Sequence, residues 1–296
     1  MKRFFLFIYL ILYCMLFAES FSGKFWGEIK NKDIVNDKVY SFQTFYTFTD
    51  NTYSLDIDCT ENFNAFNIPH IYIKTVAGKQ KYSESGTYTT QLKNGFSYIF
   101  FHNSTPFQVR KSFGYLQYKN NFLFIDGKNL IFQCFQNYFD NGNIQEIKNV
   151  VTSSFLSENK TKYTGDNFKY IHNDLLPWVE GVQGDGIGEW IEITFKVWAA
   201  KKGNLCFLVS NGYVDFNRTD LYYANNRVKK LQVVCNDYRV DFETELTDSP
   251  QFQLIKVPVI DIASGTTLTV RFIIKEVFKG DKYEDTCVNL IVPFQE

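Results

Sequence analysis

The sequence predicts an all-β protein of two domains, in which an antiparallel barrel or sandwich precedes a jelly-roll β-sandwich. Two observations support this fold class. Apolar and polar residues alternate in many short segments, which is the period-2 pattern of half-buried strands. Turn-forming Gly, Asn and Asp residues separate these segments, and no long amphipathic helix interrupts them. Short antiparallel strands with frequent turns favour a barrel or a sandwich.

The first domain is expected over residues 21–138. Aromatic and polar residues alternate over 40–48 and again over 53–58. Asn94-Gly95 is a hairpin signal, because both residue types tolerate the positive φ angles of a tight turn between strands. The sequence therefore predicts a strand that continues from this turn over 96–101.

The second domain is expected over residues 148–296. The stretch at 139–147 is polar and rich in turn residues, so it is interpreted as a linker. Long loops between antiparallel strands then favour a jelly-roll sandwich. The expected strands are Trp190–Val197, Leu205–Ser210, Lys229–Cys235, Gln251–Val257, Leu268–Phe278 and Val288–Val292.

The N-terminus has the pattern of a secretory signal peptide at residues 1–20. A basic start is followed by an apolar run from Phe4 to Ala18, and small residues lie at its exit. Cleavage is expected after Ser20, with Ala18 as the other candidate. An uncleaved anchor and lipidation of Cys14 stay open as alternatives. No other stretch is long enough to span a membrane, so no span is expected in the mature chain.

Composition and charge exclude several classes of partner. The 296 residues contain 31 Lys and Arg against 32 Asp and Glu, a formal net charge of -1. Nucleic-acid binding needs a clustered excess of positive charge, so nucleic acid is not the expected partner. The same balance of charge argues against a polybasic membrane-binding patch.

The usual catalytic and metal-binding patterns are absent from the sequence. Its three His residues show no His-x-x-x-His spacing, and there is no Cys-x-x-Cys or Gly-x-Ser-x-Gly motif. Glu243 and Glu245 share one face of an expected strand and are interpreted as solvent-facing, not as a glycosidase pair. We expect no catalytic residue, no metal site and no resident cofactor.

Five cysteines lie beyond the signal sequence, and their long, irregular spacing predicts buried thiols. One disulfide among Cys206, Cys235 and Cys287 stays open as an alternative.

The stretch 177–193 is the most distinctive part of the chain. Four glycines lie between Gly181 and Gly188, but neither the phosphate-loop order nor the Gly-x-Gly-x-x-Gly spacing is present. A strand pattern follows directly, instead of a helix whose N-terminus could hold a pyrophosphate. The glycines therefore indicate a tight loop that leads into a strand, since glycine allows positive φ angles.

This stretch and several that follow it resemble the discoidin-like family, also described as galactose-binding-like or coagulation-factor type C. The resemblance covers roughly residues 148–296 and is to the glycan-binding translocation domain of bacterial secreted NAD glycohydrolases. Their enzyme half has no counterpart here, so the resemblance implies binding without NAD hydrolysis. The segments that carry it are 151–156, 163–168, 188–193, 211–213, 225–231 and 279–287.

The resemblance implies that loops at one end of the sandwich hold the binding residues. Sugars pack their C–H faces on aromatic rings, while polar side chains bind the hydroxyls. Trp178 is equally interpreted as a core residue, and Arg227 as the ion-pair partner of Asp185 or Glu180. The candidate ligand-binding residues are Trp178, Glu180, Asp185, Tyr213, Asn226, Arg227, Tyr283 and Asp285.

Discoidin-like domains often hold a calcium ion in a loop. The resemblance makes Asp166, Asp174 and Asp185 the candidate ligands for a structural calcium here.

These observations predict an exported, non-catalytic protein that binds a carbohydrate or glycoconjugate on a cell surface or matrix. It would be secreted, periplasmic or associated with the cell envelope. The main alternative is an envelope protein that contacts other proteins without binding sugar. A hydrolase in the N-terminal domain is a further alternative.

Overall fold

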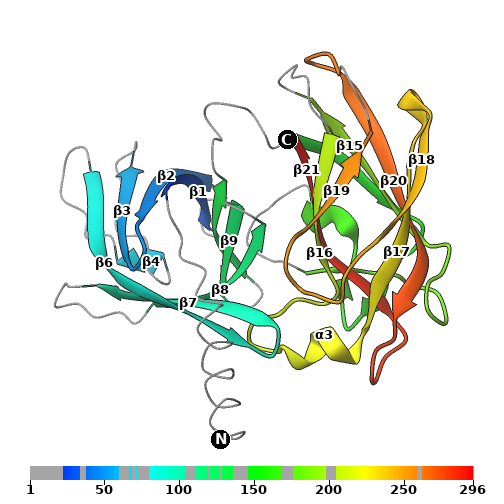
Figure 1. The fold of residues 1–296 in the computed structure, drawn as a ribbon, viewed down its shortest axis with the longest axis horizontal. Helices are drawn as coiled ribbons and strands as arrows, with labels where there is room; N and C mark the ends of the chain where they lie inside the picture. The colour runs from blue at the N-terminus through cyan, green and yellow to red at the C-terminus, as the bar shows by residue number, and fades with distance from the viewer. Residues whose placement is uncertain are drawn as a thin grey trace, which may run out of the picture.

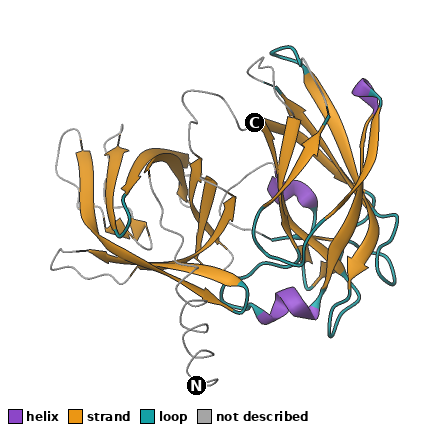
Figure 2. Ribbon diagram, in the orientation of Figure 1, coloured by secondary structure: helices purple, strands orange, loops and turns teal. Residues whose placement is uncertain are grey.

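The computed structural model describes residues 23–33, 38–59, 67–68, 71–72, 80–103, 111–118, 121–126, 129–135, 146–168, 176–197, 205–258 and 262–295. These residues are nearly all β, as expected, and form a barrel and a sandwich (Figures 1 and 2). The expected signal peptide lies outside them, as does most of the expected linker. No described helix is long and apolar enough to cross a bilayer.

The N-terminal strands close into an antiparallel barrel in the order β1-β10-β9-β8-β7-β6-β3-β2. Closure is made by the pairing of Trp26 with Phe135. Of the two architectures that the sequence allowed, the structure therefore has the barrel. Its strands are β1 (Gly23–Asp33), β2 (Lys38–Phe48), β3 (Thr52–Cys59), β6 (Gln80–Lys93), β7 (Phe96–Asn103), β8 (Lys111–Tyr118), β9 (Asn121–Asp126) and β10 (Asn129–Phe135), and a small hairpin adds β4 (Asn67–Ile68) and β5 (Ile71–Tyr72).

On β3, Tyr53 and Leu55 are buried while Thr52 and Asp56 are exposed, which is the alternation that the sequence pattern predicts. Tyr53 and Phe101 are buried with their ring centroids 4.6 Å apart. The hairpin predicted at Asn94-Gly95 connects β6 to β7, and both residues have positive φ angles, 52° and 78°. A turn of this hand matches the twist of the two strands that it joins.

The C-terminal strands form one sheet that folds over into two layers. The order is β11-β15-β20-β17-β21-β16-β19, with β14 on β21 and β18 on β17. The ring of Phe207 on β16 packs edge-on against Phe195 on β15 and Phe272 on β20, which places the core between the layers. The strands are β11 (Glu146–Thr152), β14 (Trp178–Val179), β15 (Trp190–Lys196), β16 (Leu205–Asn211), β17 (Asn226–Cys235), β18 (Val240–Glu245), β19 (Gln253–Val257), β20 (Thr267–Phe278) and β21 (Thr286–Gln295).

Short elements complete the sandwich. The strands β12 (Ser157–Glu158) and β13 (Thr161–Lys162) pair in a hairpin, and α3 (Asp220–Ala224) is a single turn of helix. The 3₁₀ turns are η1 (Gly165–Phe168) and η2 (Asn236–Tyr238).

Two expectations about the sandwich need correction. The strand expected from Lys229 begins at Asn226, because Asn226 and Arg227 pair in parallel with the start of β21. The open alternative of a disulfide among Cys206, Cys235 and Cys287 is wrong, since the structure joins no two of these buried cysteines by a disulfide.

The two domains pack against each other through Phe216 of the sandwich. Its ring contacts the edges of Phe96 and Tyr98, with centroids 5.4 and 5.6 Å away. Tyr98 Oη donates a hydrogen bond to the carbonyl of Phe216 at 3.2 Å. A Cβ atom on Gly114 would lie 1.8 Å from the Phe216 ring, so the interface requires glycine there.

Candidate functional site

Four loop segments meet at one end of the sandwich: 180–189, 211–213, 225–227 and 279–285. We call this region the loop end. Asn226 connects three of its segments. Its side-chain amide donates to Asp185 Oδ1 at 3.1 Å and to the carbonyl of Glu284 at 2.6 Å, and its Oδ1 accepts from Gly280 N at 2.7 Å. Asn226 is buried, so its hydrogen-bonding capacity serves the loops.

Glu180 fastens the glycine-rich loop to β21. Its carboxylate is buried and accepts hydrogen bonds from Val182 N at 2.8 Å and Thr286 N at 3.2 Å. Burial raises the pKa of Glu180 above its ordinary value, and the two N–H donors oppose that rise. A Cβ atom on Gly186 would lie 2.6 Å from Glu180 Cγ, so glycine is needed beside the carboxylate.

Arg227 forms an ion pair that the sequence did not indicate. Arg227 is 5% exposed, and its guanidinium binds both carboxylate oxygens of Asp248, at 3.0 and 2.6 Å. The interpretation that Arg227 pairs with Asp185 or Glu180 is therefore wrong. The same guanidinium donates to the carbonyls of Asn225 and Lys279 at 3.0 and 2.9 Å. Arg227 thus holds three segments together.

The two aromatic candidates nearest the core are largely enclosed. Trp178 is fully buried, and its indole N–H donates to the carbonyl of Ser154 at 2.8 Å. It therefore offers no exposed face for a sugar to stack on. Tyr213 is half-buried against Tyr163, and burial raises the pKa of its hydroxyl above the ordinary value.

The remaining candidates reach the surface. Lys279 donates to the carboxylate of Asp185, and this bond lowers the pKa of Asp185. Tyr283 is 39% exposed, with Lys282 Nζ 4.7 Å from its ring centroid. Partial burial raises the pKa of Asp285. A ring and several charged groups are therefore accessible at this end.

The candidate calcium ligands do not gather in the described part of the chain. Asp166 Oδ2 accepts a hydrogen bond from Thr164 at 3.0 Å, while Asp185 binds Lys279. Asp174 lies outside the described residues. No group of three His, Cys, Asp or Glu side chains that could hold a metal occurs among the residues described.

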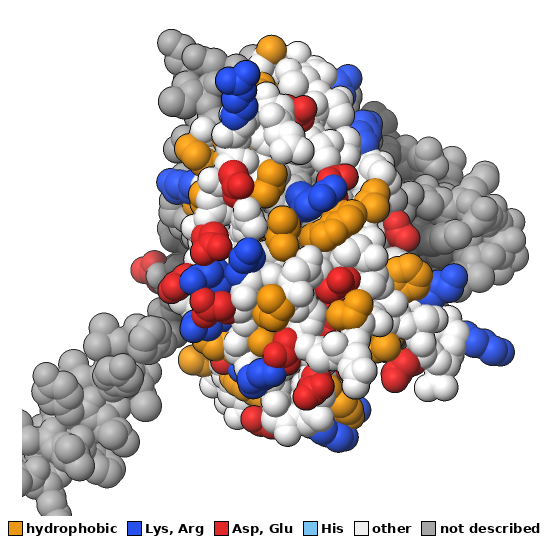
Figure 3. Space-filling view, turned by 90° about the vertical axis from the view of Figure 1, so that its right-hand side faces the viewer, with side chains coloured by type: hydrophobic (Ala, Val, Ile, Leu, Met, Phe, Trp, Pro, Cys, Tyr) orange, Lys and Arg blue, Asp and Glu red, His pale blue; other side chains and the backbone are white. Residues whose placement is uncertain are grey.

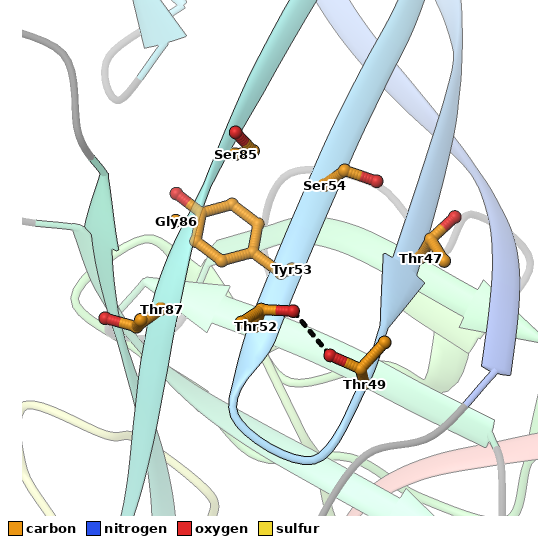
Figure 4. Close-up of a pocket in the computed structure, with 8 residues that line it drawn as sticks. All are labelled: Thr47, Thr49, Thr52, Tyr53, Ser54, Ser85, Gly86 and Thr87. Carbon is orange, nitrogen blue, oxygen red and sulfur yellow. Dashed lines mark hydrogen bonds between the residues drawn. The ribbon is translucent and has the colours of Figure 1, made fainter.

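A hollow of about 440 Å³ lies on the barrel, across β2, β3 and β6 (Figure 4). Thr49 and Thr52 share a hydrogen bond at its rim. Tyr53 points from β3 toward Gly86 on β6, and its ring is buried. The lining offers hydroxyl groups but neither a charged side chain nor an exposed ring, so the loop end is the stronger candidate. The lining residues are Thr47, Thr49, Thr52, Tyr53, Ser54, Ser85, Gly86 and Thr87.

The sandwich side that Figure 3 shows carries acidic and basic side chains interspersed with apolar ones. Opposite charges are paired on the sheet face. Glu276 binds Lys229 and Lys230 at 2.8 and 2.7 Å, which lowers the pKa of Glu276 to about 2. Arg271 binds Glu192 at 2.7 Å. Paired charges make no single-sign field that would attract a polyanion.

A two-layer β-sandwich whose long loops gather at one end is the architecture expected of a discoidin-like domain of the F5/8 type C class. Residues 138–293, just over half of the chain, match the family described as NAD glycohydrolase translocation F5/8 type C domain. The chain belongs to this family, which confirms the resemblance drawn from the sequence. No curated protein matches the chain. The matched domain is the translocation domain of NAD glycohydrolases, not their catalytic domain.

Proposed function

We propose that this protein is exported and binds a glycan, without catalysis, at the loop end of its sandwich. The main support for this proposal is that an exposed ring, that of Tyr283, and the Asp185–Lys279 ion pair lie on neighbouring loops. Asn226 and Arg227 hold these loops together. The expected signal peptide and the family of the sandwich support export. Loops that are fixed before binding lose little conformational entropy when a ligand arrives, which favours affinity.

The chemistry of the accessible groups suits a saccharide. A sugar ring can lay its C–H face on Tyr283, while Asp185 accepts and Lys279 donates hydrogen bonds to its hydroxyls. Trp178, Glu180, Asn226 and Arg227 support this site from beneath it. We therefore assign ligand contact to Asp185, Lys279 and Tyr283.

A second candidate function is protein contact at the same end without sugar. Phe155, Val182 and Ile187 are apolar and exposed, Ile187 by 55%. The backbone of Phe155 lies directly against Gly181, so Phe155 and Val182 flank the same loop. Exposed apolar side chains near a polar rim are typical of protein interfaces.

The test is binding of the full chain to an array of neutral, sialylated and sulfated glycans. Tyr283→Ala and Lys279→Met should each weaken binding about tenfold, or ~1.4 kcal/mol. Lys275→Met is the matched control, because Lys275 is exposed on β20 and its Nζ donates to Gln232 on β17, not to a residue of the loop end.

Absence of binding to every glycan would contradict the proposed function and favour protein contact. In that case Ile187→Ser should weaken capture of an envelope protein, whereas Tyr283→Ala should not. Equal losses in Lys279→Met and Lys275→Met would place the glycan site elsewhere.

A further inference from the structure

We propose that the N-terminal barrel is a positioning domain for the loop end, and that it holds the 279–285 loop through α3. The proposal deepens the proposed function and rests on it only for the effect on ligand binding. Its structural part rests on a continuous series of contacts from the β6–β7 hairpin to the amides beside Tyr283.

The first contacts join the barrel to α3. Tyr223 Oη donates to the carbonyl of Asn94 at 3.2 Å, at the tip of the β6–β7 hairpin. The Phe96 ring packs edge-on against Tyr222, with centroids 5.8 Å apart. Figure 1 shows this hairpin beside α3. A Cβ atom on Gly95 would lie 2.8 Å from Tyr223 Oη, so the approach is close.

The next contacts join α3 to the 279–285 loop. The carbonyl of Tyr223 accepts from Asp281 N at 2.9 Å, and the carbonyl of Ala224 accepts from Tyr283 N at 2.8 Å and Lys282 N at 3.1 Å. These carbonyls belong to the last turn of α3, which has no further helical residues to bond them. The loop that presents Tyr283 therefore takes its position from the end of α3.

A side-chain connection runs in parallel with these backbone bonds. Tyr222, which touches Phe96, donates from Oη to Asp248 Oδ1 at 3.1 Å. Asp248 also binds Arg227, which in turn donates to the carbonyl of Lys279. The barrel thus contacts both routes that lead into the loop.

The helix α3 cannot set its own position. It has five residues, and its N-cap Thr219 makes no side-chain capping bond. A helix this short is not stable alone in water, so tertiary packing must hold it. The sandwich supplies one side of that packing, and Asn94 and Phe96 of the barrel supply another.

The test is amide hydrogen exchange of the full chain after the barrel is detached. Gly114→Val places atoms where the Phe216 ring lies, and Phe96→Ala removes two ring contacts. Ser112→Val is the matched control, because Ser112 is exposed two residues before Gly114 on β8. Small-angle scattering reports whether the two domains separate.

We expect Asp281, Lys282 and Tyr283 amides to exchange at least about tenfold faster in both interface variants, and at the wild-type rate in Ser112→Val. Amides of β16 should stay protected, which shows that the sandwich remains folded. The proposal would be overturned if the two domains separate and the amides of residues 281–283 still exchange at the wild-type rate. It would also be overturned if scattering shows that the domains stay together in both variants, since the contacts of Gly114 and Phe96 would then not hold them together.

Glycan binding is measured on the same variants. Weaker binding in Gly114→Val than in Ser112→Val supports both proposals. If the wild type binds no glycan while exchange at 281–283 still depends on the barrel, the proposed function fails and the positioning role stands.

Discussion

Arg227 shows how a single side chain can define the loop end. A guanidinium has five N–H donors in a fixed plane, and here they reach Asp248 and the carbonyls of Tyr223, Asn225 and Lys279. Asp248 lies 21 residues further along the chain, so no local spacing pattern could have indicated it. The sequence identified Arg227 as a candidate but could not reveal that its donors are used internally.

Replacing Arg227 should therefore unfold the sandwich more easily. Arg227→Met leaves the Asp248 carboxylate and several carbonyls without their donors, and we expect a loss of about 3 kcal/mol in the free energy of unfolding. Urea denaturation followed by fluorescence measures this value. Arg218→Met is the control, because Arg218 and its partner Asp220 are both exposed and the change should be small. Equal losses in the two variants would contradict the structural role of Arg227.

Glu180 gives the loop end a pH dependence of predictable sign. Its pKa in the folded protein is raised by burial, so the folded state holds the proton to higher pH than the unfolded state. The stabilisation that Glu180 contributes to the folded state is fully present below about pH 4, the ordinary pKa range for Glu. It is lost as the pH rises through the raised pKa.

The comparison with Glu180→Gln isolates this effect, because glutamine has the same shape and does not titrate. The free energy of unfolding of Glu180→Gln minus that of the wild type should increase as the pH is raised from about 4 to about 7. Urea titrations at a series of pH values measure the difference. A difference that stays constant or decreases would show that burial does not govern this carboxylate.

At the scale of elements, the strands were the most predictable feature. Alternation locates β2, β3, β15 and β20 within a residue or two, because side chains of a half-buried strand face core and solvent in turn. Strand β17 began earlier than predicted, since Asn226 and Arg227 are polar and their pairing with β21 has no signal in a local pattern.

Two glycine turns of the sandwich should differ in how strongly an alanine substitution destabilises the protein. Gly212 and Gly265 both have positive φ angles, 76° and 86°. A Cβ atom on Gly265 would meet nothing within 4 Å, whereas one on Gly212 would lie 2.7 Å from Arg227 and Tyr222. Gly265→Ala should cost about 1 kcal/mol from backbone strain alone, and Gly212→Ala about 1–3 kcal/mol more from overpacking. Thermal unfolding of the two variants tests this order, and a reversed order would contradict the packing at Gly212.

At the scale of the whole molecule, the sequence predicted two domains but not their contact. Gln251 illustrates why. Its Oε1 accepts from Gln117 N at 2.8 Å, and its Nε2 donates to Ser97 Oγ at 3.1 Å and to the carbonyl of Tyr115 at 3.3 Å. These partners lie more than 130 residues away, and a lone glutamine in a turn gives no hint of them. The same holds for Phe216 and Gly114.

The interface predicts that barrel and sandwich unfold together. Phe96 and Leu116 of the barrel belong to the same buried cluster as the sandwich core. Exchange pulse labelling in increasing urea should therefore show peptides of β7–β8 and of β16 losing protection at the same concentration. In Gly114→Val the barrel peptides should lose protection first. Separate transitions in the wild type would contradict a shared core.

The position of β21 has a consequence for how the sandwich is made in a cell. Among the described strands of the sandwich, β21 comes last in chain order, yet it pairs with β16, β14 and β17, and both of its faces are buried over 286–293. A nascent chain that has not released these residues lacks the strand that joins the two layers. Strands β14, β16 and β17 therefore stay incompletely paired until β21 emerges, and the sandwich can close only after that.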